Sequence, residues 1–216
     1  MGVSRKQAAI NKEQILVSAE RLFRLRGVDA VGLAEVMATA GFTQGGFYNH
    51  FSSKNSLVSE VMERALSKGA EDLDEAVQRS EASGVDPLAR QLEWYLAPEQ
   101  RDDVACGCPL VAFAGDAARL EGAPVVSYRE VLAHTYKVFE SLIRQREPGI
   151  SAADAQQKAI GLFSMMAGAV MLSRAIEPAD RKLANDVLRQ TKSFAFSAIG
   201  GGPASKKGAR RTKPSV

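Results

Sequence analysis

Apolar residues recur with a helical period in the N-terminal part of the chain. They fall at positions i, i+4, i+7 and i+8 counted from Ile15, which places them on one face of a helix. Arg24 and Arg26 close the pattern, where cations suit the negative end of a helix, and Gly27 is a typical stop residue. The pattern predicts a first helix over about residues 8–26.

The rest of the chain alternates between helical segments and turn residues. A second short helix ends before Gly41, a third follows with Thr43 as its N-cap, and a fourth restarts at Ser52 or Ser53. The predicted helices after the first cover about residues 33–39, 44–50, 53–79, 86–97, 104–120, 124–146, 152–176 and 179–197. No run alternates apolar and polar residues as a strand would, so we expect an all-α fold of about nine helices.

The charges are distributed unevenly over the 216 residues. Residues 1–55 carry a net charge of +3, residues 56–199 carry −5, and residues 200–216 carry +5 without a single acid. A polyanion would be attracted to both ends and repelled by the middle. The tail, 200–216, is too polar and too rich in glycine to bury a core, so we expect it to be disordered. It would be either simply solvated or a source of non-specific affinity for DNA.

Targeting signals and cysteine usage bear on the compartment. No signal peptide is recognisable, and the longest charge-free apolar stretch, between Lys158 and Arg174, has fifteen residues. A membrane span needs roughly 20. The two cysteines, Cys106 and Cys108, alternate along the chain and are poorly placed for an intrachain disulfide. We therefore expect a cytoplasmic protein without a membrane span.

The segment 31–57 combines two short helices with a tight turn that contains a glycine. This is typical of a helix-turn-helix, whose second helix enters the DNA major groove. Gly41 permits the turn at positive φ. The residues that can pack the two helices together are Leu33, Val36, Ala40, Phe42 and Phe47.

That packing leaves one face of the third helix for DNA. The residues predicted on this face are Thr43, Gln44, Gly45, Gly46, Tyr48, Asn49 and His50. Gln44 is the candidate for reading a base, because its amide can pair bidentately with adenine, and Gly46 allows a close approach. Tyr48 and His50 are expected to contact phosphates, and Lys54 adds its charge at the start of the fourth helix.

Residues 13–60 resemble the N-terminal domain of the TetR/AcrR family of repressors. The matching elements are Ala19, Leu22-Phe23, Gly27, Ala40-Gly41, Thr43, Gly45, Tyr48, His50-Phe51, Ser53-Lys54 and Leu57. Gly32 departs from the family's usual capping threonine, and Met37 replaces a usually small residue; neither change lies on the DNA face.

The resemblance implies an organisation and a set of partners. Residues 8–54 would form the helix-turn-helix domain, and residues 55–199 the effector-binding and dimerisation domain. The partners would be a palindromic double-stranded DNA operator, a second copy of the chain and a small-molecule effector. Dimerisation would use the last two helices. The apolar run "AIGLFSMMAGAVML" supports this independently, because it is too apolar for a helix with one solvent face.

The C-terminal part shows no enzyme, metal or cofactor signature, so we expect no cofactor. In the resembling family this part encloses a ligand pocket. The residues predicted to line it are Trp94, Cys108, Phe113, Tyr128 and Met165. Four others could join them: Tyr95, Tyr136, Phe163 and Met166. For each of these residues the alternative is an ordinary place in the core.

The segment "GCPLVAFAGDAA" resembles the start of the sixth helix in a branch of the family that includes redox- and electrophile-responsive repressors. In that branch a cysteine at the position of Cys108 is the sensor. Pro109 suits a first helical position, which makes Cys108 the N-cap, where a thiolate gains reactivity. The alternatives are a buried structural cysteine or, with few other ligands at hand, zinc binding. The branch's basic partner would be Arg174, which cannot act as an amine nucleophile.

The leading hypothesis is thus a DNA-binding repressor, relieved by a small-molecule or electrophile/redox effector. One alternative is a DNA-binding regulator without a small-molecule effector. The other is a thiol-redox enzyme that uses Cys106 and Cys108.

Overall fold

The computed structural model describes residues 4–200, which form eleven helical elements and no strand. They are α1 (Arg5–Arg26), α2 (Leu33–Thr39), the 3-10 helix η1 (Gln44–Asn49), α3 (Lys54–Ala82), α4 (Pro87–Tyr95), α5 (Pro98–Asp102), α6 (Pro109–Ala112), α7 (Ala114–Ala117), α8 (Ala123–Arg146), α9 (Ala152–Ile176) and α10 (Arg181–Ala198). The predicted all-α class is confirmed. The predicted tail lies outside the described residues from 201 onward.

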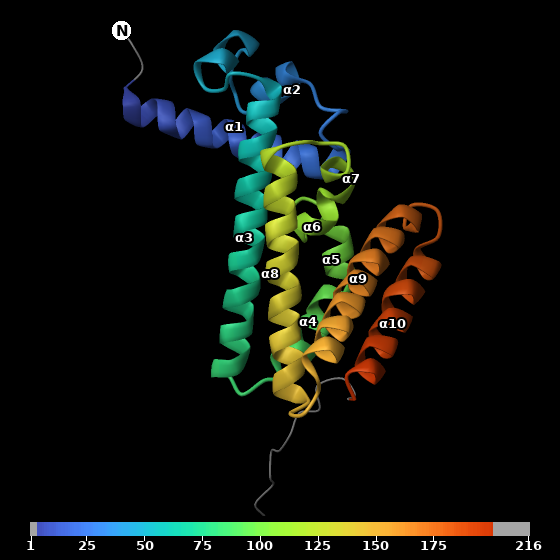
Figure 1. Ribbon diagram of the computed structural model, residues 1–216. Helices are drawn as coiled ribbons and strands as arrows, with labels where there is room; N and C mark the ends of the chain where they lie inside the picture. Colours follow the sequence, from blue (N-terminus) through green and yellow to red (C-terminus); the bar gives the residue numbers. More distant parts are fainter. Residues whose placement is uncertain (1–3, 201–216) are drawn as a thin grey trace, which may run out of the picture.

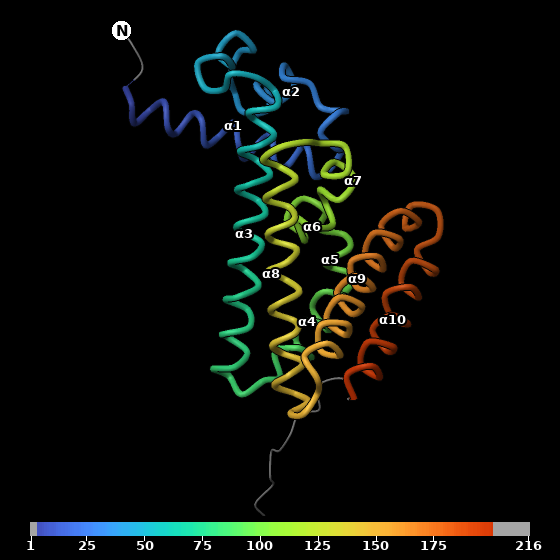
Figure 2. Tube along the Cα trace, viewed as in Figure 1, coloured from blue at the N-terminus to red at the C-terminus, as the bar shows by residue number. Residues whose placement is uncertain are grey.

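The helices form an elongated body with the helix-turn-helix at one end. Figures 1 and 2 show α1, α2 and η1 at the top, with the long helices α3 and α8 running down side by side from them. The pair α9 and α10 forms the opposite flank, and the short helices α4 to α7 fill the space between the two layers. The N-terminal unit is joined to the body through α1, which packs against α3 and α6.

Side-chain caps and glycines fix the helix ends. Ser4 accepts a hydrogen bond from the backbone N–H of Gln7, which is why α1 begins three residues before the predicted start. Ser53 caps α3 in the same way, as one of the two predicted starts requires. Gly27 ends α1 with φ +82°, a conformation that side chains rarely adopt.

The single helix predicted over residues 104–120 is wrong, and so the count of about nine helices is too low. Residues 109–112 and 114–117 form two short helices, α6 and α7, and α5 occupies part of the predicted connection before them. Pro109 has no N–H to donate, so it begins a helix rather than continuing one from residue 104. As predicted, Cys108 is the N-cap and Pro109 the first residue, although no side chain caps α6.

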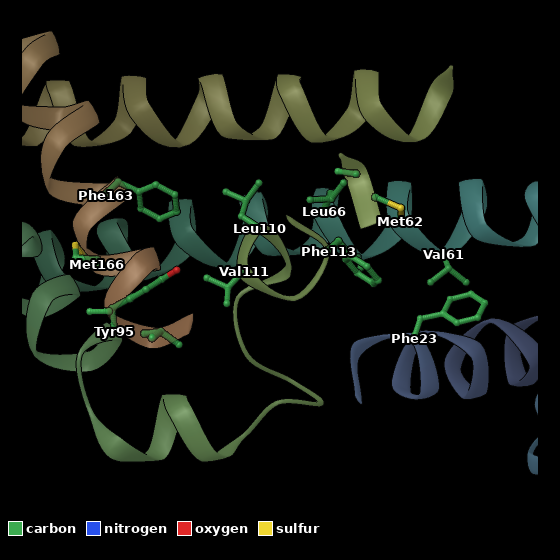
Figure 3. Close-up of a cluster of buried hydrophobic side chains, with 14 of the residues drawn as sticks. Phe23, Val61, Met62, Leu66, Tyr95, Leu110, Val111, Phe113, Phe163 and Met166 are labelled. Atoms are coloured by element: carbon green, nitrogen blue, oxygen red, sulfur yellow. The ribbon is translucent and has the colours of Figure 1, made fainter. Parts of the chain in front are cut away.

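One continuous apolar core joins the N-terminal unit to the body. Figure 3 shows it running from Phe23 of α1, past Met62 of α3 and Phe113, to Tyr95 of α4 and Phe163 of α9. All of these side chains are buried. The apolar packing is therefore continuous from α1 into the body.

Helix α9 is long and apolar enough, by composition, to cross a membrane, a test that the core helix of a soluble protein also passes. It packs between α8 and α10, and the Ser173 hydroxyl donates to the carbonyl of Ala184 in α10 at 2.9 Å. Several large apolar side chains of this pair remain exposed in the single chain: Ile160, Met171, Leu172, Leu183 and Phe194. Such a patch is typical of an interface rather than of a free surface.

Candidate DNA-binding end and effector cavity

The helix-turn-helix is assembled on a small buried core. Val36, Met37 and Phe47 are fully buried between α1, α2 and η1. Gly41 has φ +84°, as the tight turn requires, and the N–H of Phe42 donates to the carbonyl of Met37 at 2.8 Å. The turn between the two helices is therefore rigid, and it sets the direction of the second helix.

The second helix of this motif is a 3-10 helix with Thr43 at its N-cap, as predicted, although the Thr43 side chain does not cap it. The Thr43 hydroxyl makes no capping bond; the carbonyl of Thr43 instead accepts from the N–H of Gly46 at 3.0 Å. Two consecutive glycines favour an α-helix poorly, which suits the tighter 3-10 form in so short a segment.

The residues predicted to face DNA occupy the end of the molecule. Thr43, Gln44, Gly45, Tyr48 and Asn49 are exposed, whereas Gly46, His50 and Lys54 are half-buried. Tyr48 is 71% exposed while its ring edge rests on Phe47, with 5.3 Å between the ring centroids. A β-carbon at Gly46 would lie 3.7 Å from Cε of Met37, so that glycine packs closely on α2.

Arg24 connects α1 to the segment that carries the two cysteines. Its Nη1 donates to the carbonyl of Gly107 at 2.7 Å, its Nε donates to Glu20 at 2.9 Å, and its guanidinium lies 5.5 Å from the Phe113 ring centroid. The side chain is almost completely buried. These contacts link the helix-turn-helix unit to the 106–108 segment through hydrogen bonds that water cannot easily replace.

Asp116 of α7 makes a second connection to the end of α1. Its buried carboxylate accepts from the N–H of Val28 at 3.1 Å and from Nη2 of Arg119 at 3.0 Å. Val28, which follows the end of α1, is thereby held by α7. Together with the Arg24 contact, this fixes the position of α1 against α6 and α7.

The body contains a cavity of about 780 Å³. Its walls come from α3, α4, the 106–110 segment, α8 and Phe163 of α9. This volume is within the range of small-molecule sites. The 106–110 segment therefore has the cavity on one side and Arg24 on the other.

The predicted lining residues divide into two groups. Trp94 and Cys108 line the cavity, as do Tyr95 and Phe163. The others predicted are not among the lining residues: Phe113, Tyr128, Met165, Tyr136 and Met166. Phe113 packs under Arg24, and the hydroxyl of Tyr128 donates to the carbonyl of Leu110 at 2.7 Å, so both support the wall from behind.

Gln91 is a lining residue that the sequence analysis missed. It is 5% exposed, and its amide makes no side-chain hydrogen bond to another residue in the range 4–200. The sequence does contain a signal for it: Gln91 lies one turn before Tyr95, on the same helix face as the apolar residues Leu88 and Leu92, so a polar side chain is expected to be buried there.

Two tyrosines near the cavity stay protonated far above neutral pH. Burial raises the pKa of Tyr95 well above its usual value, and the neighbouring Cys108 raises it further. Burial, with smaller effects of Cys108 and Tyr136, raises the pKa of Tyr128 to about 12. The hydroxyl of Tyr95 is buried without a hydrogen-bond partner of acceptable geometry. Tyr95 is therefore an unused donor at the cavity wall.

Both cysteines are free thiols that line the cavity, Cys106 exposed and Cys108 half-buried. The Arg174 guanidinium, the predicted basic partner of Cys108, is engaged with the backbone instead: it donates to the carbonyls of Gln100 and Arg101 at 2.8 and 2.9 Å. Within residues 4–200, no group of three or more His, Cys, Asp or Glu side chains could hold a metal ion.

A helix-turn-helix at one end and a separate helical body are typical of DNA-binding transcriptional regulators, and comparisons with known proteins agree. Residues 15–61 match the family model for bacterial regulatory proteins of the tetR family. The uncharacterized HTH-type transcriptional regulator YxaF of Bacillus subtilis is 29% identical over 76% of this chain and 84% of its own length. The HTH-type transcriptional repressor NemR of Escherichia coli is 25% identical over 81% of this chain and 90% of its own.

Solved structures share the fold. The reduced form of E. coli NemR superimposes with a TM-score of 0.71 at 21% identity, covering 90% of this chain and all of that one. A TetR regulator from Chloroflexus aurantiacus gives a TM-score of 0.74 at 20% identity, covering 90% and 96%. Together, the family model over the N-terminal residues, the curated relatives and the shared fold support a TetR-family DNA-binding transcriptional regulator. These relatives and structural neighbours are transcriptional regulators and not enzymes, which speaks against the thiol-redox enzyme considered above.

Proposed function

We propose that this protein is a repressor that binds a palindromic operator as a homodimer and leaves it when a small molecule occupies the cavity. Residues 8–54 would serve as the DNA-binding domain, residues 55–199 as the effector and dimerisation domain, and the protein would act in the cytoplasm. The observation that carries the proposal is the hydrogen bond from Arg24 to Gly107, because it joins α1 to a wall of the cavity.

The DNA-binding role is supported by the exposed end of the molecule. Gln44 is exposed at the start of η1, where its amide can reach a base edge. Lys54 is the first residue of α3, so its charge adds to the positive helix end that attracts a phosphate. Tyr48 and His50 would add phosphate contacts that orient the protein.

The control of DNA binding follows from the position of the 106–110 segment. An occupant that pushes this segment outward also moves the Gly107 carbonyl, to which Arg24 is bonded. α1 packs against both α2 and α3, so its displacement re-aims η1. Because a packed core does not deform smoothly, a small shift at the cavity changes the spacing of two recognition helices in a dimer.

The proposed dimer would use α9 and α10, whose exposed apolar side chains need a cover. Two copies would then present two η1 helices to successive major grooves, about 34–36 Å apart along the duplex. A palindromic operator follows from the twofold symmetry of such a pair.

The direct test is binding to the DNA upstream of the protein's own gene, measured by gel shift at several salt concentrations with reduced protein. We expect a sequence-specific complex that weakens steeply with salt. A protein that forms no specific complex there contradicts the operator proposal. A complex that no cavity-binding compound dissociates would favour a regulator without a small-molecule effector.

A second candidate for the effector is a compound that modifies a thiol. Cys106 and Cys108 both line the cavity, so a reactive compound would arrive where the non-covalent effector binds. Mass spectrometry after limiting N-ethylmaleimide, with Cys106→Ser and Cys108→Ser variants, tests this candidate. Loss of operator binding that requires Cys108 would support a thiol sensor, whereas modification of either thiol without effect on DNA binding would remove it.

A further inference from the structure

Two buried polar side chains of α4 lie beside the aromatic part of the cavity wall. Tyr95 and Gln91 lie one helical turn apart on α4, so their side chains are neighbours on the same face. Both residues are more than nine-tenths buried, and both line the cavity. Among residues 4–200, the hydroxyl of Tyr95 has no hydrogen-bond partner of acceptable geometry.

An unpartnered buried donor is a cost that a native core rarely carries without a reason. Because burial keeps the Tyr95 phenol protonated, it offers a proton and requires an acceptor. The Cys108 thiol lies beside this hydroxyl, but a thiol is a weak acceptor, and within the described residues no hydrogen bond of acceptable geometry forms. A molecule in the cavity would supply the acceptor.

The surrounding wall indicates the shape of that molecule. Phe163 lies edge-on to Tyr95 and Phe139, with ring centroids 5.8 and 5.6 Å apart. Trp94, half exposed, stands at the same cavity. Flat aromatic groups pack well against edges and faces arranged in this way.

The charges around the cavity argue against an ionic ligand. Its lining contains two acids, Asp72 and Glu75, and two arginines, Arg79 and Arg90, so the formal charges cancel. Glu75 pairs with Arg79, and Asp72 pairs with Lys68. All four charged lining residues are exposed. Arg174 lies near Tyr95 and Cys108 behind the wall, but it is not a lining residue, and its guanidinium already donates to the carbonyls of Gln100 and Arg101. Burying an ion there without a partner would be costly.

We infer that the cavity takes a neutral aromatic compound whose carbonyl-type oxygen accepts a hydrogen bond from the hydroxyl of Tyr95, with the Gln91 amide available to a second polar group one turn away. This inference rests on the proposed function, in which the cavity receives the effector. It adds the chemical class of the ligand and the residue that selects it.

The test compares three probes of similar shape by calorimetry on the free, reduced protein. They are 2-acetonaphthone, its planar hydrocarbon counterpart 2-isopropenylnaphthalene, and 2-naphthoate. The wild type should bind the ketone about threefold to tenfold more tightly than the hydrocarbon, the contribution of one neutral hydrogen bond. The naphthoate should bind more weakly than the ketone.

Two phenylalanine variants identify the donor. Tyr95→Phe should abolish the preference for the ketone and leave binding of the hydrocarbon unchanged. Its thermal stability should not fall, since the removed hydroxyl has no partner. Tyr128→Phe is the matched control, because that hydroxyl is already bonded to Leu110; this variant should keep the preference.

Equal affinity of the wild type for ketone and hydrocarbon, no binding of either, tighter binding of the naphthoate, or a preference that survives in Tyr95→Phe would each overturn the inference. Release of operator DNA is measured separately. Tyr95-dependent binding of the ketone without any release would contradict the proposed function and leave the ligand class standing.

Discussion

The Nη1 atom of Arg24 donates to the carbonyl of Gly107 at 2.7 Å, joining two residues that are 83 positions apart in the chain. Arg24 lies in the last turn of α1, and Gly107 lies between the two cysteines at the cavity wall. This bond connects the part that would meet DNA with the part that would meet the ligand.

Replacing Arg24 with alanine should destabilise the protein and uncouple the cavity from DNA. The change leaves the Gly107 carbonyl and the Glu20 carboxylate without their donor in a buried setting, which costs about 2–4 kcal/mol. For a chain of this length Tm should fall by roughly 5–15 °C. Arg26→Ala is the control, since its ion pair with Glu35 is exposed and contributes about 1 kcal/mol or less. Equal Tm values for the two variants, by calorimetry, would contradict the role of Arg24.

Replacing Gln44 with alanine should relax the choice of base without abolishing binding. If its amide pairs bidentately with adenine, the operator complex weakens by roughly 1–3 kcal/mol while binding to unrelated DNA is unchanged. Fluorescence anisotropy with the operator and with a set of single-base variants measures both effects. An equal loss on all sequences would assign Gln44 to the phosphate backbone instead.

Lys54→Ala should weaken binding to every sequence to a similar extent. Removing one phosphate contact lowers the slope of log K against log salt by about 1. Lys68→Ala is a suitable control, because Lys68 lies further along α3 and pairs with Asp72. The slope should be unchanged in that variant. A change in sequence preference, rather than in slope, would show that Lys54 reads bases.

An acidic residue on the proposed dimer face should give monomers. Leu172 and Phe194 are 63% and 65% exposed in the single chain, and a charge at either position would have to be buried between two subunits. Sedimentation of Leu172→Asp and Phe194→Asp should show the mass of one chain, with operator affinity greatly reduced. Val126→Asp, at an exposed apolar position on α8, should remain a dimer. If all three variants stay dimeric, the interface lies elsewhere.

The buried tyrosines give a prediction about alkaline pH. Burial raises the folded-state pKa of Tyr128 from 10.0 to about 12, so the folded protein holds this proton more tightly than the unfolded chain. The resulting stability is present below pH 10 and is lost as the pH rises from about 10 toward about 12. Urea unfolding at pH 9 and pH 11 should show a smaller decrease in Tyr128→Phe than in the wild type. An identical decrease would mean that Tyr128 is not responsible.

Elements with local signals were predictable from the sequence. α2 and α9 were predicted at their observed bounds, because Gly41 and the Pro-Gly pair before α9 are local stop signals. The region 104–120 was not, since its course depends on distant partners. Arg24, Val28 and Arg174 bond to the chain between residues 100 and 116, and no local pattern reveals those contacts.

The cavity was predictable only in part for the same reason. Trp94 and Cys108 stand out by residue type, and both line it. Phe113 is equally conspicuous, yet it packs beneath Arg24, because the break after Ala112 turns it toward α1. Gln91 is inconspicuous until α4 is folded and its neighbours are known to be buried.

Gly69 sits in the middle of α3, where glycine ordinarily weakens a helix by roughly 0.5–1 kcal/mol relative to alanine. A β-carbon there would lie 2.5 Å from Cγ of Pro109, so the proline ring occupies the space of the missing side chain. The backbone of α3 at Gly69 thus lies directly against the ring of Pro109, the first residue of α6. No flexible side chain lies between the two helices at this point to absorb a movement. A methyl group at this position, as in Gly69→Ala, would push α3 and the 106–110 segment apart. The substitution would thus impose, without any ligand, the displacement that we propose for an effector in the cavity.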